Sequence, residues 1–198
     1  MYPKSIKNLI ESFKMLPGIG EKTAERMAFF ILDFDEENVE FFSESLLNAK
    51  NNIRKCSICN NFTDNDICDI CADKTRNNEI LCIVEDPKNI YMFEKNGVFN
   101  GYYHVIENLI SPLDGINPED IGLEKLLKRI KENNFKEIII AVKPSIEGET
   151  TSLYIKRVLE GLNIKITRIA SGIPIGADME YIDALTLERA ILDRKELE

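Results

Sequence analysis

Four cysteines in two Cys-x-x-Cys pairs are the residues of this chain best suited to hold a metal ion. Cys56 pairs with Cys59, and Cys68 pairs with Cys71. Each pair can form a tight turn that directs two thiolates toward one ion. Four thiolates complete a tetrahedral coordination shell and leave no open position for a substrate. The spacing therefore predicts a structural zinc site with one Zn2+ per chain.

Few apolar residues surround these cysteines, so the metal would supply much of the folding free energy of this segment. Disulfides are one alternative, but they need an oxidising compartment, and residues 1–10 do not resemble a secretory signal. A redox-active cysteine pair is a second alternative. Iron bound by the four thiolates is a third, and the geometry of the site does not exclude it. Paired knuckles at this spacing favour zinc. The fifth cysteine, Cys82, lies in an apolar run and is predicted to be buried, and the single histidine, His104, is not needed as a ligand.

Gly18 and Gly20 lie between two segments in which apolar residues recur at helical spacing. Two helices joined in this way look like a helix-hairpin-helix, which binds DNA without reading its sequence. The glycines let the backbone approach a phosphate, and the second helix presents free N–H groups at its start. Lys22 and Arg26, four residues apart, add two cations on one face near that end.

Two other interpretations of the hairpin have weaker support. The run Gly-x-Gly-x-Lys-Thr is superficially similar to a phosphate-binding P-loop, but Glu21 stands where that motif needs glycine, and a helix precedes it. A plain helix–helix corner without a ligand is the other alternative. DNA contact is favoured because the glycines and the cations coincide. A third helix is predicted to follow, with these apolar residues facing inward: Val39, Phe42, Leu46, Leu47 and Ile53.

The charge balance limits how this chain could bind DNA. Its formal net charge is -9 and its pI about 4.9, which argues against an extensive phosphate-binding surface. Residues 4–26 nevertheless carry an excess of Lys and Arg over Glu. Any DNA contact is therefore expected to be local, salt-sensitive and modest per subunit, which favours an oligomer. No apolar run is long enough to span a membrane.

From residue 80 onward, short apolar runs alternate with segments of helical periodicity. The runs are 80–84, 102–106, 137–142 and 164–170, and the helical segments are 89–96, 121–133 and 150–162. This alternation predicts right-handed β-α-β units and a mainly parallel sheet flanked by helices. Ligand sites gather at the carboxyl ends of such strands. Glu85 and the residues after 106 and after 142 are therefore the positions of interest.

Glu85 and the run Lys-Pro-Ser-Ile-Glu-Gly-Glu at 143–149 resemble a Toprim domain. Catalytic members hold magnesium with an acidic residue after the first strand and an Asp-x-Asp pair. In this chain Lys143 and Ser145 stand where the aspartates would be. The resemblance implies a Toprim domain without catalysis, so the protein is not expected to be an enzyme.

The order of hairpin, four-cysteine module and non-catalytic Toprim resembles the RecR family of bacterial recombination mediators over the whole chain. Other matching segments are 101–105, 110–116, 118–120, 147–150, 154–155, 167–170, 172–176 and 180–183. The chain departs from the family pattern in loops on the Toprim side, at Glu107, Asn108, Ser171 and Ala177. These departures concern partner binding, whereas the hairpin and cysteine motifs are intact.

The resemblance implies a ring-shaped homotetramer in the bacterial cytoplasm. With RecO- and RecF-type proteins it would help load RecA on single-stranded DNA during recombinational repair. The implied DNA contacts are Lys22, Arg26, Gly18 and Gly20, and the implied zinc ligands are Cys56, Cys59, Cys68 and Cys71. The implied partner-binding residues are Glu85, Glu147 and Glu149.

The predicted division of the chain has four parts: a hairpin region at 1–54, a zinc finger at 55–76, a Toprim domain at 77–172, and a C-terminal segment with a helix, in oligomer contacts, at 173–198. Two alternative functions remain at this point. One is a Toprim metal-dependent nuclease or topoisomerase-like enzyme, and the other is a zinc-stabilised adaptor that does not bind DNA.

Overall fold

The computed structural model describes residues 2–194 and 196 of the 198-residue chain. The chain divides into two compact units, Met1–Ile53 and Arg54–Glu198, and each has its own apolar core. Within the described residues, no helix combines the length and the apolar character that crossing a membrane would require.

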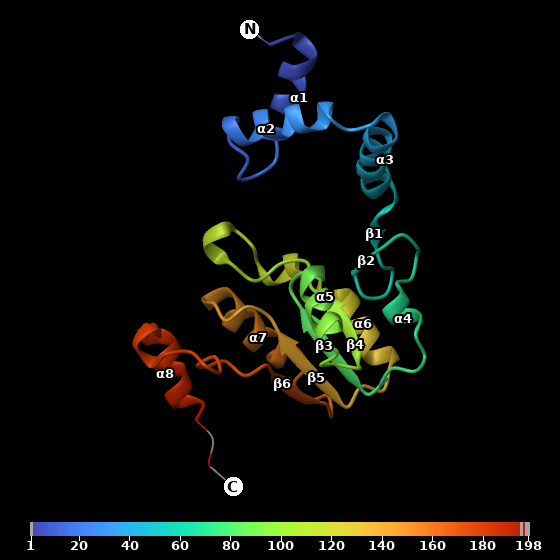
Figure 1. The fold of residues 1–198 in the computed structure, drawn as a ribbon. Coiled ribbons are helices and arrows are strands. Elements are labelled where there is room, and N and C mark those ends of the chain that lie inside the picture. The colour runs from blue at the N-terminus through green and yellow to red at the C-terminus, as the bar shows by residue number, and fades with distance from the viewer. Residues whose placement is uncertain (1, 195, 197–198) are drawn as a thin grey trace. The chain divides into compact units, whose positions relative to one another are not determined.

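The first unit consists of three helices: α1 (Lys4–Lys14), α2 (Glu21–Leu32) and α3 (Glu36–Asn52) (Figure 1). Helices α1 and α2 pack together around Ile10, Ala24 and Ala28, which are all buried. The small alanines allow close approach of the two helices. The turn between them contains Gly18 at φ +81°, in the left-handed region that favours glycine. The predicted pair of N-terminal helices is confirmed.

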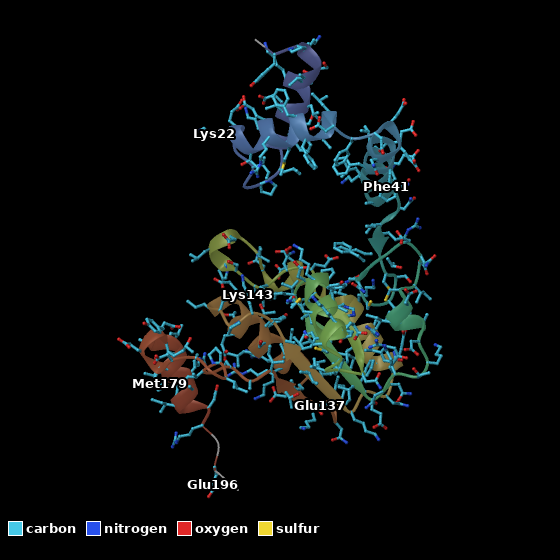
Figure 2. All side chains as sticks on the ribbon, in the orientation of Figure 1. Lys22, Phe41, Glu137, Lys143, Met179 and Glu196 are labelled. Carbon is cyan, nitrogen blue, oxygen red and sulfur yellow. The ribbon has the colours of Figure 1, made fainter. Side chains whose placement is uncertain are left out.

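Helix α3 begins at a regular cap, where the side chain of Asp35 accepts a hydrogen bond from the Asn38 N–H at 3.1 Å. None of its residues is buried. Phe41, labelled on α3 in Figure 2, is 72% exposed, and Leu47 is 63% exposed. The expectation that its apolar stripe faces inward is wrong for this chain: Val39, Phe42, Leu46, Leu47 and Ile53 are all exposed. Helical periodicity groups these side chains on and just after α3, but none of them is buried in the structure.

The second unit starts with a small module that holds the four cysteines. It contains the antiparallel pair β1 (Arg54–Lys55) and β2 (Phe62–Thr63), followed by the short helix α4 (Asp69–Ala72). Apart from the four cysteines, the apolar residues packed in this module are Ile58 and Ile70. So small a core is consistent with a module that depends on bound metal.

A four-stranded parallel sheet forms the centre of the second unit. Its strands are β3 (Ile80–Val84), β4 (Tyr102–Val105), β5 (Glu137–Ala141) and β6 (Lys165–Arg168), in the order β4-β3-β5-β6. Leu81 lies opposite Tyr102 on one side and Ile138 on the other. The predicted parallel sheet is confirmed, with β4 and β6 at its edges.

Helices cover both faces of this sheet. They are α5 (Pro87–Asn96), α6 (Leu123–Glu132) and α7 (Ile146–Val158). Among the described residues, 3-10 turns lie at Pro112–Asp114, Pro118–Ile121 and Met179–Tyr181. Alternate strand residues such as Leu81 pack with α6 and α7, whereas Cys82 packs with α5. Because both faces are covered, the central strand β3 and most of β5 are apolar, whereas the edge strand β6 also carries Lys165, Thr167 and Arg168. Cys82 is 2% exposed, as predicted for a small buried residue.

The C-terminal helix α8 (Ala184–Leu192) follows β6 after an irregular segment. Its contacts with the sheet domain include ion pairs: Arg189 pairs with Glu149 of α7 at 3.4 Å, and Asp193 pairs with Arg168 of β6 at 3.6 Å. Its apolar side chains remain largely in solvent, since Leu185 is 66% and Leu192 64% exposed.

Gly148 provides a test of the packing between α7 and the end of β5. A Cβ atom added there would overlap the backbone carbonyl oxygen of Lys143. Gly148→Ala is therefore expected to destabilise the protein by about 1–3 kcal/mol, measured by urea unfolding followed by circular dichroism. Gly172→Ala is the matched control, because its added Cβ would lie 3.9 Å from the Cβ of Ala190, an ordinary contact. Equal midpoints for the two variants would contradict the assigned packing.

Candidate functional site

The four cysteines converge in the second unit. Their sulfur atoms all lie within 4.8 Å of one another, and each side chain is buried. Cys56 and Cys59 come from the turn between β1 and β2. Cys68 is the N-cap of α4, and Cys71 lies within that helix. Two short turns thus place two sulfurs each on a common centre, as the Cys-x-x-Cys spacing predicts.

Backbone N–H groups are directed at these sulfurs. The amides of Ile58 and Cys68 lie 3.4 and 3.3 Å from Cys56 Sγ, and the amide of Asn61 lies 3.5 Å from Cys59 Sγ. Hydrogen bonds donated to a thiolate favour its charged form. Backbone groups therefore prepare the sulfurs of Cys56 and Cys59 to act as metal ligands.

The geometry of the cluster fits a tetrahedral metal and not a disulfide. Cys59 Sγ and Cys68 Sγ are 3.5 Å apart, whereas a disulfide bond measures about 2.05 Å. Four ligands at the usual Zn–S distance of about 2.3 Å would be roughly 3.8 Å apart. Contact with Cys68 and Cys71, together with burial, raises the pKa of the Cys59 thiol well above its ordinary value. Four thiolates this close together repel one another, so they can coexist here only around a cation, and Zn2+ would hold the two knuckles together.

The first knuckle is docked on the edge strand β4. The N–H of Val105 donates to the carbonyl of Cys59 at 2.8 Å, and Nδ2 of Asn60 donates to the carbonyl of Val105 at 2.9 Å. Asn60 has φ +63°, a left-handed conformation that asparagine tolerates better than most residues. The cysteine module thus covers part of the sheet edge that β4 would otherwise leave open to solvent.

Helix α6 also contacts the cysteine module. Nζ of Lys125 donates to the carbonyl of Cys56 at 3.2 Å, and Arg129 lies 3.9 Å from Cys71 Sγ while donating to the carbonyl of Tyr103. Sequence reasoning missed Asn60, Lys125 and Arg129. The available signals were an asparagine directly after the first pair, and two cations four residues apart on an amphipathic helix.

His104 lies on β4 and is fully buried. In the part of the chain that the structure describes, neither ring nitrogen has a hydrogen-bond partner. Burial, with the positive charges of Arg129 and Lys125, lowers the pKa of His104 to about 3. The ring is therefore neutral at physiological pH, and the metal-ligating group consists of the four cysteines without it.

The hairpin of the first unit leaves its backbone accessible. A Cβ atom added at Gly18 or Gly20 would meet nothing within 4 Å, so a ligand can approach closely there. Gly20 is the N-cap of α2 and makes no side-chain capping bond, so the first N–H groups of the helix face outward without a side-chain acceptor.

Lys22 and Arg26 are exposed on the first two turns of α2. Figure 2 labels Lys22 on this helix. Glu21 would repel a phosphate at this helix end, but its carboxylate is paired with Lys14 at 2.7 Å. Within residues 2–194 and 196, neither Lys22 nor Arg26 has a carboxylate oxygen within 4.0 Å. The hairpin thus combines open glycines, a helix N-terminus and two cations available to an anion.

The predicted acidic residues of the Toprim edge are engaged by their neighbours. Glu85 accepts from the N–H of Lys143 at 3.1 Å, and Glu147 accepts from the hydroxyl of Ser145 at 2.6 Å, which lowers the pKa of the Glu147 carboxyl. Glu149 forms ion pairs with two arginines from β6 and α8. Among the described residues, the four-cysteine cluster is the one group arranged to hold a metal ion, so the three carboxylates do not converge on a common centre.

The loop residues that depart from the family pattern also have local partners. Glu107 pairs with Lys55 of β1 at 3.4 Å, and Asn108 donates to the carbonyl of Asp120 at 3.1 Å. The hydroxyl of Ser171 lies 3.4 Å from a carboxylate oxygen of Asp193. These loops are therefore tied to the body of the second unit.

A parallel sheet of this topology with a four-cysteine module on its edge defines a Toprim protein with a structural zinc finger. Four protein-family models match consecutive segments of the chain: the RecR helix-hairpin-helix at 6–50, the RecR four-cysteine zinc finger domain at 53–73, a Toprim domain at 79–170, and the RecR C-terminal region at 172–195. The chain belongs to the RecR family. Its role is therefore in recombinational DNA repair, and it binds DNA. It carries a structural zinc ion at the four cysteines. The Toprim domain of this family is non-enzymatic.

The fifth cysteine offers a matched control for the zinc site. Cys71→Ser is expected to lose most of its bound zinc, because serine provides no thiolate. Cys82→Ser should keep one zinc ion per chain, since Cys82 lies outside the cluster. Zinc content after gel filtration, measured with a chromophoric chelator, distinguishes the two. Full zinc in Cys71→Ser, or its loss in Cys82→Ser, would contradict the ligand assignment.

Proposed function

We propose that this protein is a DNA-clamping recombination mediator. It assembles as a homotetramer and, with RecO- and RecF-type partners, helps load RecA on single-stranded DNA. The observation that carries the proposal is the exposed hairpin, in which two unpaired cations flank an open helix N-terminus. The same proposal assigns DNA binding to residues 1–54, zinc to 55–76, the Toprim fold to 77–172 and oligomer contacts to 173–198.

The chemistry of the hairpin suits a phosphate backbone. Gly18 and Gly20 allow main-chain N–H groups to approach a phosphate oxygen, while Lys22 and Arg26 supply charge. None of these groups reads base edges, so binding would be independent of sequence. Because the chain carries a net charge of -9, a single hairpin would bind weakly, and several acting together would be needed.

Uncovered apolar surface supports the assembly. Helix α3 exposes Phe41, Leu46 and Leu47, and α8 exposes Leu185, Ile191 and Leu192. Contiguous exposed apolar side chains on a helix favour burial against a partner. A ring of identical subunits with two kinds of interface needs two such surfaces on each subunit, and this chain has one in each unit.

The Toprim edge is proposed to bind partners and not to cut DNA. Lys143 and Ser145 occupy the positions where catalytic members carry magnesium-binding aspartates, and an ammonium group and a hydroxyl cannot replace them. Glu85, Glu147 and Glu149 would instead present an acidic surface to RecO- or RecF-type proteins. This assignment argues against the nuclease alternative, and the exposed cations of the hairpin argue against an adaptor that does not bind DNA.

Removing the two hairpin cations tests the DNA assignment. The double variant Lys22→Ala with Arg26→Ala is expected to bind DNA at least tenfold more weakly near 100 mM salt. The slope of log affinity against log salt should become less steep by about 0.9 for each duplex phosphate that is no longer neutralised. The control, Lys95→Ala with Lys131→Ala, makes the same change in net charge on the second unit. A salt slope equal to that of the control would refute the hairpin assignment.

Substitutions on α3 test the proposed tetramer. Phe41→Asp is expected to reduce the mass in solution from that of a tetramer of 22.7 kDa chains to that of a smaller species, measured by light scattering. Asn48→Asp introduces the same charge on the same helix and should leave the assembly intact. Because Phe41 is 72% exposed in the single chain, the substitution should not unfold the protomer, which circular dichroism would verify. An unchanged mass for Phe41→Asp would exclude α3 as an interface.

A further inference from the structure

The zinc centre brings a charge into the interior of the protein. One Zn2+ with four thiolates carries a formal charge of −2. The four cysteines are at most 7% exposed, so water screens this charge poorly. A buried charge is costly unless an opposite charge lies near it. The surroundings of the cluster should therefore contain cations.

Arg129 of α6 is a buried cation that lacks an ordinary counter-ion. Its side chain is 9% exposed, and its guanidinium lies 5.9 Å from the ring centres of both Tyr102 and Phe135. In the described part of the chain, no carboxylate oxygen lies within 4.0 Å of it. One terminal nitrogen donates to the carbonyl of Tyr103, and the other lies 3.9 Å from Cys71 Sγ. The anionic group that this arginine faces is the thiolate of Cys71.

Lys125 repeats the arrangement at the other knuckle. It lies four residues before Arg129, so both side chains leave α6 on the same face. Its ammonium group donates to the carbonyl of Cys56 at 3.2 Å and to the amide oxygen of Asn60. It too has no carboxylate within 4.0 Å among residues 2–194 and 196. His104, the other titratable group beside the two cations, is neutral and adds no charge.

We propose that Arg129 and Lys125 are the counter-cations of the zinc–thiolate centre and the residues that position its two knuckles. Arg129 faces the second knuckle through Cys71, and Lys125 holds the first through Cys56. Because Arg129 also binds β4 through Tyr103, metal binding is coupled to the edge of the parallel sheet. The proposal rests on the zinc centre and is independent of the proposed DNA-binding function.

Methionine substitutions test the charge at nearly constant volume. In the full-length zinc-loaded protein, Arg129→Met is expected to lower zinc affinity at least tenfold at pH 7, measured by competition with a chromophoric chelator. Because zinc binding releases the thiol protons, the pH midpoint of zinc binding should move upward as the affinity falls. Lys125→Met should likewise lower zinc affinity and raise the pH midpoint of zinc binding. Arg129→Lys, which keeps the charge, should restore most of the affinity.

Lys128→Met is the matched control. Lys128 lies on the same helix and lines the same cavity of about 650 Å³ beside the cysteine module, but its side chain is exposed and lies 3.9 Å from Glu132. It should leave both zinc affinity and the pH midpoint unchanged. Substitution of Co2+ for zinc reports the ligand geometry, and Arg129→Met should retain the absorption spectrum of a tetrahedral cobalt–thiolate site.

Two outcomes would overturn the proposal: wild-type zinc affinity and pH midpoint in Arg129→Met, or an Arg129→Lys variant that binds zinc as weakly as Arg129→Met. The second outcome would assign Arg129 a purely structural role through its bond to Tyr103. If Arg129→Met does not fold, Lys125→Met provides the test instead. Wild-type zinc affinity and a wild-type pH midpoint in Lys125→Met would then overturn the proposal.

Discussion

The convergence of four cysteine sulfurs is the interaction on which the cysteine module, and its place on the sheet edge, depends most. The sulfurs lie within 4.8 Å of one another, where their thiolates would repel without a cation. Zinc turns this repulsion into the main stabilising interaction of a segment with few apolar residues. Because Val105 and Asn60 link the first knuckle to β4, the metal also protects an edge of the Toprim sheet.

The Toprim fold serves here as a scaffold. Its helices and parallel strands form a well-packed core, yet the carboxylates at the ends of the strands are held by their own neighbours. Ser145 engages Glu147, and Arg168 engages Glu149. Metal binding has a structural role at the cysteine cluster, and the hairpin carries the cations suited to DNA. Separate parts of one short chain thus serve different functions.

Helix α3 marks the limit of periodicity as a guide to packing. Its apolar residues recur at helical spacing, which the sequence displays directly, and that spacing suggests an inner face. In the structure Phe42, Leu46 and Leu47 are exposed. Periodicity tells which side chains share a face of a helix, but it does not tell whether the same chain or another one covers that face.

The sequence by itself determined the local features: the knuckles of the Cys-x-x-Cys pairs, the glycine hairpin between α1 and α2, and the apolar runs that became β3 to β6. Each arises from residues close together in the chain, so spacing and residue type suffice. Only the tertiary structure decided that Lys125 meets Cys56, 69 residues away, that Arg129 faces Cys71, and that Glu85, Glu147 and Glu149 do not converge. Such pairings depend on how whole elements pack, and no local pattern encodes them.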